Sequence, residues 1–112
     1  MNKYKVCVYA ICKNEENFIK RWYDSVKEAD DIYVLDTGST DNSVKLLKER
    51  GVHVIAKKIT PWRFDVARNE SLKMVPADTD ICVCLDLDEI IEHGWRMKLE
   101  MVLLNNKIKK FI

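Results

Sequence analysis

The sequence has little glycine or proline, with three glycines and two prolines among 112 residues. Both glycine-rich phosphate-binding patterns, G-x-G-x-x-G and G-x-x-x-x-G-K-[ST], are absent. If the chain binds a nucleotide, its phosphates must therefore be held by a metal ion and by side chains. The sequence also lacks an apolar stretch long enough for a membrane span, and its formal net charge is only +1. Composition therefore gives no indication of binding to nucleic acid or to a membrane through bulk charge.

Apolar and charged residues are present in ordinary proportions, 47% and 33%, which is typical of one small globular domain. The first apolar segment is short, and the polar run Lys13-Asn14-Glu15-Glu16 follows it without a small-residue cleavage site. This beginning is a poor signal peptide, so we expect a cytoplasmic protein.

The four cysteines lie in two pairs with the spacings C-x4-C and C-x-C, which are not those of common zinc sites. All four fall in apolar segments that we interpret as strands, where a free cysteine behaves as a small hydrophobic residue. We therefore expect reduced core cysteines, with metal binding or disulfide formation as the alternative. The residues are Cys7, Cys12, Cys82 and Cys84.

Short apolar segments alternate with segments of helical periodicity along the whole chain. Strands are predicted at residues 5–12, 32–35, 52–56 and 81–85, and helices at about 14–26, 41–50, 64–75 and 95–105. Asn14 is a candidate N-cap for the first helix, and Phe64 and Ala67 are expected to face the sheet from the third. The alternation predicts an α/β fold, a Rossmann-like parallel sheet with helices on both faces.

The fourth apolar segment ends abruptly in carboxylates, at Asp86, Asp88 and Glu89. Such charges must emerge at the carboxyl end of the strand, which is where ligands bind in open α/β sheets. Side chains repeat every two residues on a strand, so Asp86 and Asp88 are expected on one side. Their oxygens suit Mg²⁺ or Mn²⁺ shared with substrate phosphates. A solvated acidic turn is the alternative, and His93 is a weaker candidate for a further metal ligand.

Four local patterns, in this order, resemble those of family-two glycosyltransferases with the GT-A fold. They are Ile11–Glu16, Val34–Asp41, Ala67–Asn69 and Leu85–Glu89. The Lys-Asn-Glu-Glu segment, and Trp62 followed by Ala-Arg-Asn, resemble bacterial enzymes that transfer sugars during assembly of lipopolysaccharide core or surface polysaccharide. The resemblance covers residues 5 to about 95.

This resemblance implies an inverting, metal-dependent transferase that uses a nucleotide-sugar donor, most often a UDP-sugar, and a saccharide or lipid-linked acceptor. The expected location is the cytoplasm, and the protein could attach peripherally to the inner face of the membrane. The roles that it implies are uridine contacts from Ile11, Lys13 and Glu15, a base or ribose contact from Asp36, a base or diphosphate contact from Arg68, a ribose and metal contact from Asp86, and metal coordination by Asp88.

The sequence departs from the family pattern in two ways. Many members carry a second acid directly after the one that matches Asp36, whereas this chain has Thr37. In the family the general base lies well beyond the Asp-x-Asp motif, where this sequence stops. We therefore interpret residues 1–112 as one nucleotide-sugar-binding domain, the donor half of a transferase, inactive alone. We also expect such a half to expose a sheet edge and to self-associate.

Two other functions remain open at this stage. Haloacid-dehalogenase-type phosphatases also carry Asp-x-Asp at a strand end, but on their first strand, whereas here the motif follows the fourth. A non-catalytic module that binds a nucleotide or a partner without transfer is the second alternative, because no candidate acceptor base is present.

Overall fold

The computed structural model describes residues 4–106, and within them strands and helices alternate as predicted. Most boundaries fall within a few residues of the prediction; the second strand is longer by a residue at each end, and the third helix ends two residues early. The elements are β1 (Val6–Cys12), α1 (Ile19–Val26), β2 (Asp31–Asp36), α2 (Ser43–Glu49), β3 (His53–Ala56), α3 (Phe64–Lys73), β4 (Ile81–Cys84) and α4 (Trp95–Asn106).

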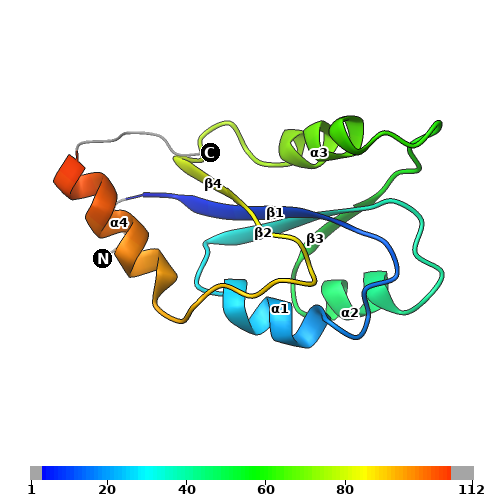
Figure 1. The fold of residues 1–112 in the computed structure, drawn as a ribbon, viewed down its shortest axis with the longest axis horizontal. Coiled ribbons are helices and arrows are strands. Elements are labelled where there is room, and N and C mark those ends of the chain that lie inside the picture. Colours follow the sequence, from blue (N-terminus) through cyan, green and yellow to red (C-terminus); the bar gives the residue numbers. More distant parts are fainter. Residues whose placement is uncertain (1–3, 107–112) are drawn as a thin grey trace.

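The strands form one parallel sheet in the order β3-β2-β1-β4. The chain runs outward from β1 to β3 and then returns across the sheet to place β4 on the other side of β1. Right-handed crossovers in opposite directions put their helices on opposite faces. Accordingly α1 and α2 lie on one face and α3 on the other (Figure 1). The predicted doubly wound α/β sheet is confirmed.

Each face of β1 has its own buried cluster. Val6, Val8 and Ala10 are fully buried toward α1 and α2, whereas Cys7 and Tyr9 face α3. This two-sided burial explains why the strand is apolar at nearly every position instead of alternating. The first cluster is the larger, and it includes the buried side chains Ile19, Trp22, Val26, Leu47, Ile81, Leu87 and Trp95.

The last helix is fixed to the end of the sheet opposite the carboxyl ends by one buried arginine. The guanidinium of Arg96 donates to the backbone oxygens of Tyr4 and Glu28, at 2.9 and 2.8 Å, and to the Asp30 carboxylate at 2.7 Å. The Glu28 carboxylate in turn accepts from the backbone N–H of Gly94. In Figure 1, α4 accordingly lies beside the amino end of β1. No helix among residues 4–106 is both long enough and apolar enough to cross a bilayer.

Three local predictions are wrong. Asn14 does not cap the first helix: α1 begins only at Ile19, and Asn14 adopts a left-handed backbone with φ of 54° inside a turn. Phe64 is 54% exposed because it opens α3 at the rim of the sheet, and Ala67 is buried against the sheet as predicted. Cys84 is exposed, although the other three cysteines are buried.

Candidate functional site: the carboxyl edge of β1 and β4

The carboxyl ends of β1 and β4 lie next to each other, at the point where the chain reverses its direction across the sheet. Ligands of open α/β folds bind in the crevice outside the carboxyl ends of the strands at such a switch point. A cavity of about 700 Å³ occupies this position. It is lined by Ile11, Cys12, Lys13, Glu15, Thr37, Lys58, Ile59, Thr60, Trp62, Phe64, Asp86, Leu87 and Asp88.

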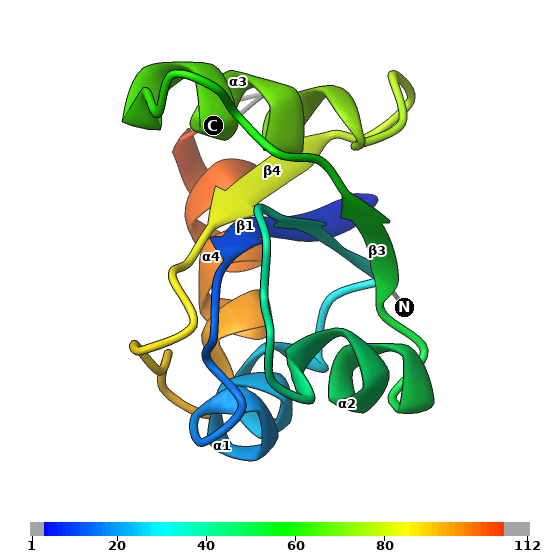
Figure 2. The ribbon, with the colours of Figure 1, turned by 90° about the vertical axis from the view of Figure 1, so that its right-hand side faces the viewer.

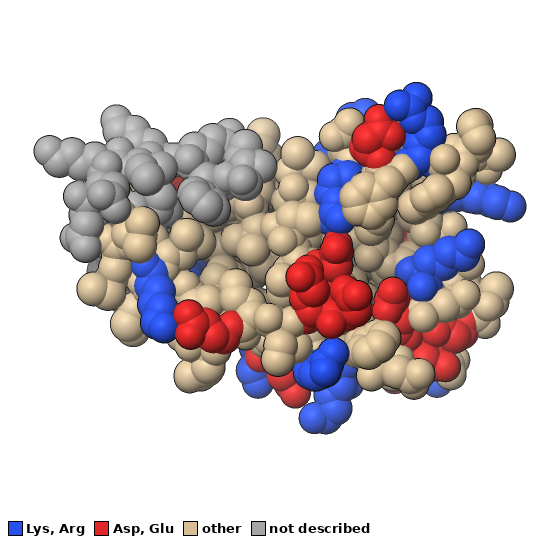
Figure 3. Space-filling model, viewed as in Figure 1, with Lys and Arg blue, Asp and Glu red and all other residues tan. Residues whose placement is uncertain are grey.

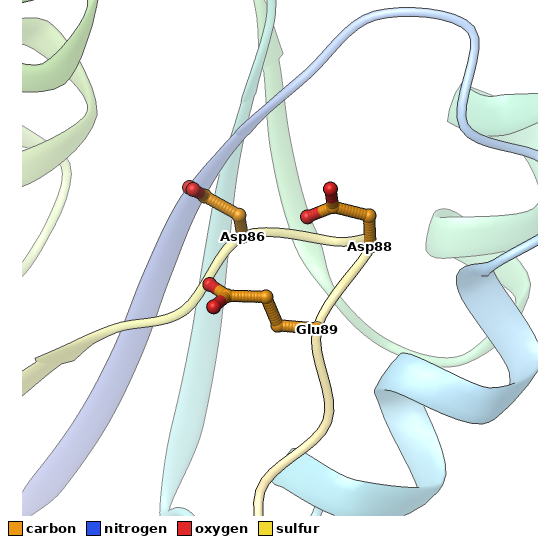
Figure 4. A group of neighbouring side chains, drawn as sticks. All are labelled: Asp86, Asp88 and Glu89. Carbon is orange, nitrogen blue, oxygen red and sulfur yellow. The ribbon is translucent and has the colours of Figure 1, made fainter.

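Three carboxylates gather on the loop after β4. Leu87 is 2% exposed and packs into the core, so its neighbours Asp86 and Asp88 are directed outward. One oxygen from each of Asp86, Asp88 and Glu89 lies within 4.8 Å of the others, and Figure 4 shows the three side chains projecting from one turn of the loop. Clustered carboxylate oxygens are hard ligands of the kind that Mg²⁺ and Mn²⁺ take. The donor set therefore fits a divalent cation.

The acidic loop is held from below by α1. The indole Nε1 of Trp22 donates to the backbone oxygen of Leu85 at 3.0 Å, directly before the first acid. The Arg21 guanidinium reaches the backbone oxygen of Asp88 at 3.4 Å, and the N–H of Glu89 closes a turn onto the Asp86 oxygen at 3.0 Å. Backbone contacts on both sides of the acids therefore fix the loop while leaving the Asp88 and Glu89 carboxylates without an ion pair among residues 4–106.

Arg68 on α3 approaches the acids from the opposite face of the sheet. Its Nη2 donates to Oδ1 of Asp86 at 2.9 Å, its Nη1 donates to the Cys84 thiol, and its guanidinium lies 4.9 Å from the centre of the Phe64 ring. The acids near Arg68 on its own helix pair with other residues: Asp65 pairs with Arg63, and Glu70 pairs with Lys57 and Lys73. Arg68 itself is outside the cavity lining, but Phe64 and Asp86, which it contacts, are part of that lining.

The Lys-Asn-Glu-Glu segment is tied to the loop after β2 by side-chain hydrogen bonds. Oδ1 of Asn14 accepts from the backbone N–H of Thr40 at 2.7 Å, and its own N–H donates to Oγ of Ser39 at 2.8 Å. The N–H of Glu15 donates to Oγ of Ser43 at 2.9 Å. These hydrogen bonds stabilise the left-handed backbone conformation of Asn14. They also hold the loop that carries Lys13 and Glu15 at the cavity.

Glu15 lies in a negative environment. Burial raises the pKa of its carboxyl, and the charges of Asp88, Asp41 and Asp86 raise it further. On the face of the molecule that Figure 1 presents, Figure 3 shows acidic side chains gathered near the middle with basic side chains beside them. A cation bound at the cavity would relieve this crowding of like charge.

Asp36 is the last residue of β2, and its carboxylate is bound by the turn that follows it. It is 3% exposed, and it accepts hydrogen bonds from the backbone N–H groups of Gly38 and Ser39 at 3.2 and 3.0 Å and from the Ser39 hydroxyl. It is not among the lining residues, whereas Thr37, directly after it, is. The contact of Asp36 with a base or ribose therefore stays a prediction, beside an observed role in shaping the turn.

The segment after β3 contributes cavity residues that the sequence analysis did not assign to the site. Lys58, Ile59 and Thr60 line the cavity, together with the 55% exposed Trp62. The rule that loops after parallel strands meet at one edge could have indicated this segment, because it directly follows the third predicted strand. His93, by contrast, lies outside the acidic cluster and beside Glu28, at 3.5 Å.

The family follows from a comparison with known proteins. The sequence model of Glycosyl transferase family 2 matches residues 7–106, nearly the whole chain. This chain belongs to glycosyltransferase family 2. The family places it outside the haloacid-dehalogenase-type phosphatases, so that alternative is excluded. Uncharacterized glycosyltransferases from Rickettsia typhi and Rickettsia prowazekii are each 28% identical to this chain over 109 residues. The match covers 96% of this chain and 36% of either relative, so the chain spans about a third of their length.

Solved structures of glycosyltransferases share this fold, which confirms the predicted GT-A architecture. Glucosyl-3-phosphoglycerate synthase from Mycobacterium tuberculosis, solved with Mn²⁺, UDP-glucose and phosphoglyceric acid, is 26% identical with a TM-score of 0.62. That alignment covers 75% of this family 2 chain and 33% of the synthase. TarS from Staphylococcus aureus, solved with UDP, is 18% identical with a TM-score of 0.72 over 92% of this chain and 33% of TarS, and it supports the fold alone.

Proposed function

We propose that this chain is the donor-binding portion of a metal-dependent, inverting glycosyltransferase that binds a UDP-sugar with Mn²⁺ or Mg²⁺. The observation that carries the proposal is the group of three convergent carboxylates, two of which, Asp86 and Asp88, line a cavity at the switch point of the sheet. The cavity volume of about 700 Å³ is in the range of small-molecule and cofactor sites. The mycobacterial synthase that shares the family's fold was solved with UDP-glucose and Mn²⁺.

In this proposal the uridine and the diphosphate of the donor contact different segments of the chain. Ile11, near the end of β1, and Lys13 and Glu15, on the loop after it, line the side of the cavity that would take the uridine. Asp86 and Asp88, on the loop after β4, would hold the metal against the diphosphate, with Asp86 also facing the ribose. No glycine-rich loop is present to bind the phosphates, which gives the acids and neighbouring cations this task.

The chemistry that follows from this arrangement is the departure of a diphosphate. As the bond from the anomeric carbon to the diphosphate oxygen breaks, UDP leaves with the bonding electrons. The acceptor hydroxyl attacks from the other side and passes its proton to a general base, which in the family lies beyond the Asp-x-Asp motif. A bound divalent cation supplies Lewis-acid stabilisation of the departing diphosphate. Lys13 and Lys58 line the same cavity and add positive charge near it. The acceptor in this proposal is a saccharide or a lipid-linked saccharide.

A thermal-shift titration tests the donor site directly. A ligand that binds only the folded chain raises its stability by mass action, by about 2.7 kcal/mol at one hundred times the dissociation constant. We expect UDP with Mn²⁺ to raise the melting temperature of the wild type, UDP alone to raise it much less, and Asp88→Ala to lose the metal-dependent part. Asp24→Ala is the matched control, because Asp24 is an exposed acid of α1 that pairs with Lys20 and does not line the cavity.

The outcomes separate the donor site from a non-catalytic module that binds only a partner. A metal-dependent shift that is lost in Asp88→Ala and kept in Asp24→Ala supports the donor site. If no uridine nucleotide shifts the melting temperature with either metal, the proposal fails and the non-catalytic alternative takes its place.

A further inference from the structure

Among the three clustered acids, Asp86 is the one that already has a cation beside it. Its Oδ1 is bound by Arg68, whereas Asp88 and Glu89 form no ion pair within the described residues. Lys13 and Lys58, the other cations at the cavity, likewise pair with no acid in that part of the chain. The site thus has free lysines and free carboxylates, but one arginine is committed to one acid.

The geometry of Arg68 is fixed by three contacts on different sides of its guanidinium. Nη2 meets Asp86, Nη1 meets the Cys84 thiol, and the face of the group lies over the Phe64 ring. The side chain is only 20% exposed, and the Asp86 side chain is 45% exposed. A partly shielded ion pair between a planar fork and a carboxylate is stronger than a pair on the open surface.

From this geometry we infer that Arg68 couples the metal to the nucleotide: it opposes binding of the cation alone and favours binding of the cation together with a diphosphate. This inference rests on the proposed donor site. A divalent cation bound to Asp86 lies within a few ångströms of the guanidinium charge and must share the carboxylate with it, so Arg68 lowers the affinity for the metal alone. Oδ2 of Asp86 accepts no hydrogen bond within the described residues and is the oxygen left for the cation.

The diphosphate changes the sign of this interaction. Its negative charges arrive beside the cation and close to Asp86, so they offset the repulsion between the cation and the guanidinium that share this carboxylate. Arg68 then stabilises the complex that it opposed before. The two ligands must therefore strengthen each other's binding by the same factor, because such coupling is reciprocal. Arg68 is in this sense a positioning residue that favours loading of the metal with the nucleotide.

Calorimetric titration of the purified chain with Mn²⁺ alone, UDP alone and UDP in saturating Mn²⁺ tests the coupling. In Arg68→Ala we expect Mn²⁺ alone to bind about fivefold more tightly and UDP in Mn²⁺ to bind about tenfold more weakly, changes in the usual range of coupling between sites. Arg68→Lys keeps the charge without the fork, so its affinity for Mn²⁺ alone should stay within about twofold of the wild type. Arg63→Ala is the matched control, since Arg63 lies in the same region but pairs with Asp65 and does not line the cavity.

The results distinguish this inference from the function on which it rests. A tighter Mn²⁺ complex in Arg68→Ala, with weaker UDP binding in Mn²⁺ and an unchanged Arg63→Ala, supports the coupling. If Arg68→Ala is folded by circular dichroism and binds Mn²⁺ alone with unchanged or lower affinity, the ion pair only orients Asp86 and the coupling is refuted. A wild type that binds neither Mn²⁺ nor UDP refutes the donor site itself.

Discussion

The contact between Trp22 and the acidic loop makes a quantitative prediction for the substitution Trp22→Phe. Trp22 is fully buried, and its indole N–H donates to the backbone oxygen of Leu85 at 3.0 Å. The substitution removes two buried carbon groups, worth about 0.8 kcal/mol each, and a hydrogen bond worth about 1 kcal/mol. We therefore expect the free energy of unfolding to fall by about 2.5 kcal/mol.

Urea denaturation followed by circular dichroism measures this change. The matched control is Trp62→Phe, because Trp62 is 55% exposed and donates no hydrogen bond in the described structure. Its substitution should change the free energy of unfolding by less than about 0.5 kcal/mol. Since the lost bond is made directly before Asp86, Trp22→Phe should also weaken Mn²⁺ binding at temperatures where it remains folded. A stability of Trp22→Phe within that same margin of the wild type would refute the reasoning.

Three further predictions concern charge and assembly. Glu15→Gln should raise the melting temperature near neutral pH, because folding raises the pKa of this carboxyl and its ionisation therefore costs stability. The stability of the wild type falls as pH rises through the folded pKa. A pH series should show that the gain in melting temperature of Glu15→Gln vanishes well below pH 4.5, the ordinary pKa of the carboxyl. The hydrogen bond from Arg96 lowers the pKa of Asp30, so this pair stabilises the fold above the ordinary pKa of 3.8, and its contribution is lost as pH falls through the folded pKa. Arg96→Met should therefore lose less stability on acidification than the wild type. Acid titrations of both proteins, with the free energy of unfolding measured at each pH, compare this dependence. The chain should self-associate through an exposed sheet edge, where β3 presents the 51% exposed Ile55, and size-exclusion chromatography giving one concentration-independent monomer peak would contradict this.

The strands and their order along the chain were predictable because their burial leaves a direct mark on the sequence. A strand covered on both faces must be apolar at almost every position, as Val6–Cys12 is. The place of Asp86 and Asp88 was predictable for a related reason, since charges cannot remain inside such a strand and must emerge at its end. The strand repeat does not extend to the acids, because β4 ends at Cys84; the turn that the Glu89 N–H closes onto the Asp86 backbone oxygen accompanies the burial of Leu87 between them.

The partner of Arg68 was not predictable, because it depends on how α3 lies across the sheet. Local spacing offered Asp65 and Glu70 on the same helix, yet the arginine pairs with Asp86 on the other side of a crossover. The role of Asn14 was missed for a similar reason. A polar residue before a helix resembles an N-cap, and only the neighbouring loop shows that its side chain binds the backbone of Thr40 instead.

The exposure of Phe64 shows where periodicity loses its meaning. The helical repeat places it on the same face as Ala67, but a helix that begins beyond the rim of the sheet has nothing to cover in its first turn. The ring of Phe64 lies against the guanidinium of Arg68 instead. Phe64, which periodicity assigned to the core, therefore lines the cavity.

The pairing of β1 with β4 has a consequence for how the chain reaches its working form. In Figure 2 the two strands lie side by side, yet Val6 pairs with Ile81, and the bonds between them join residues about 75 positions apart. Closing so long a loop is slow compared with forming the local β1-α1-β2 unit. The acids of the cavity, Asp86 and Asp88, follow β4, so a folding intermediate that lacks β4 has most of the other lining residues but not these acids in place. The time course of nucleotide binding during refolding would therefore measure when β4 pairs with β1. A ligand added at the start of refolding would stabilise the completed sheet without accelerating formation of the first helices.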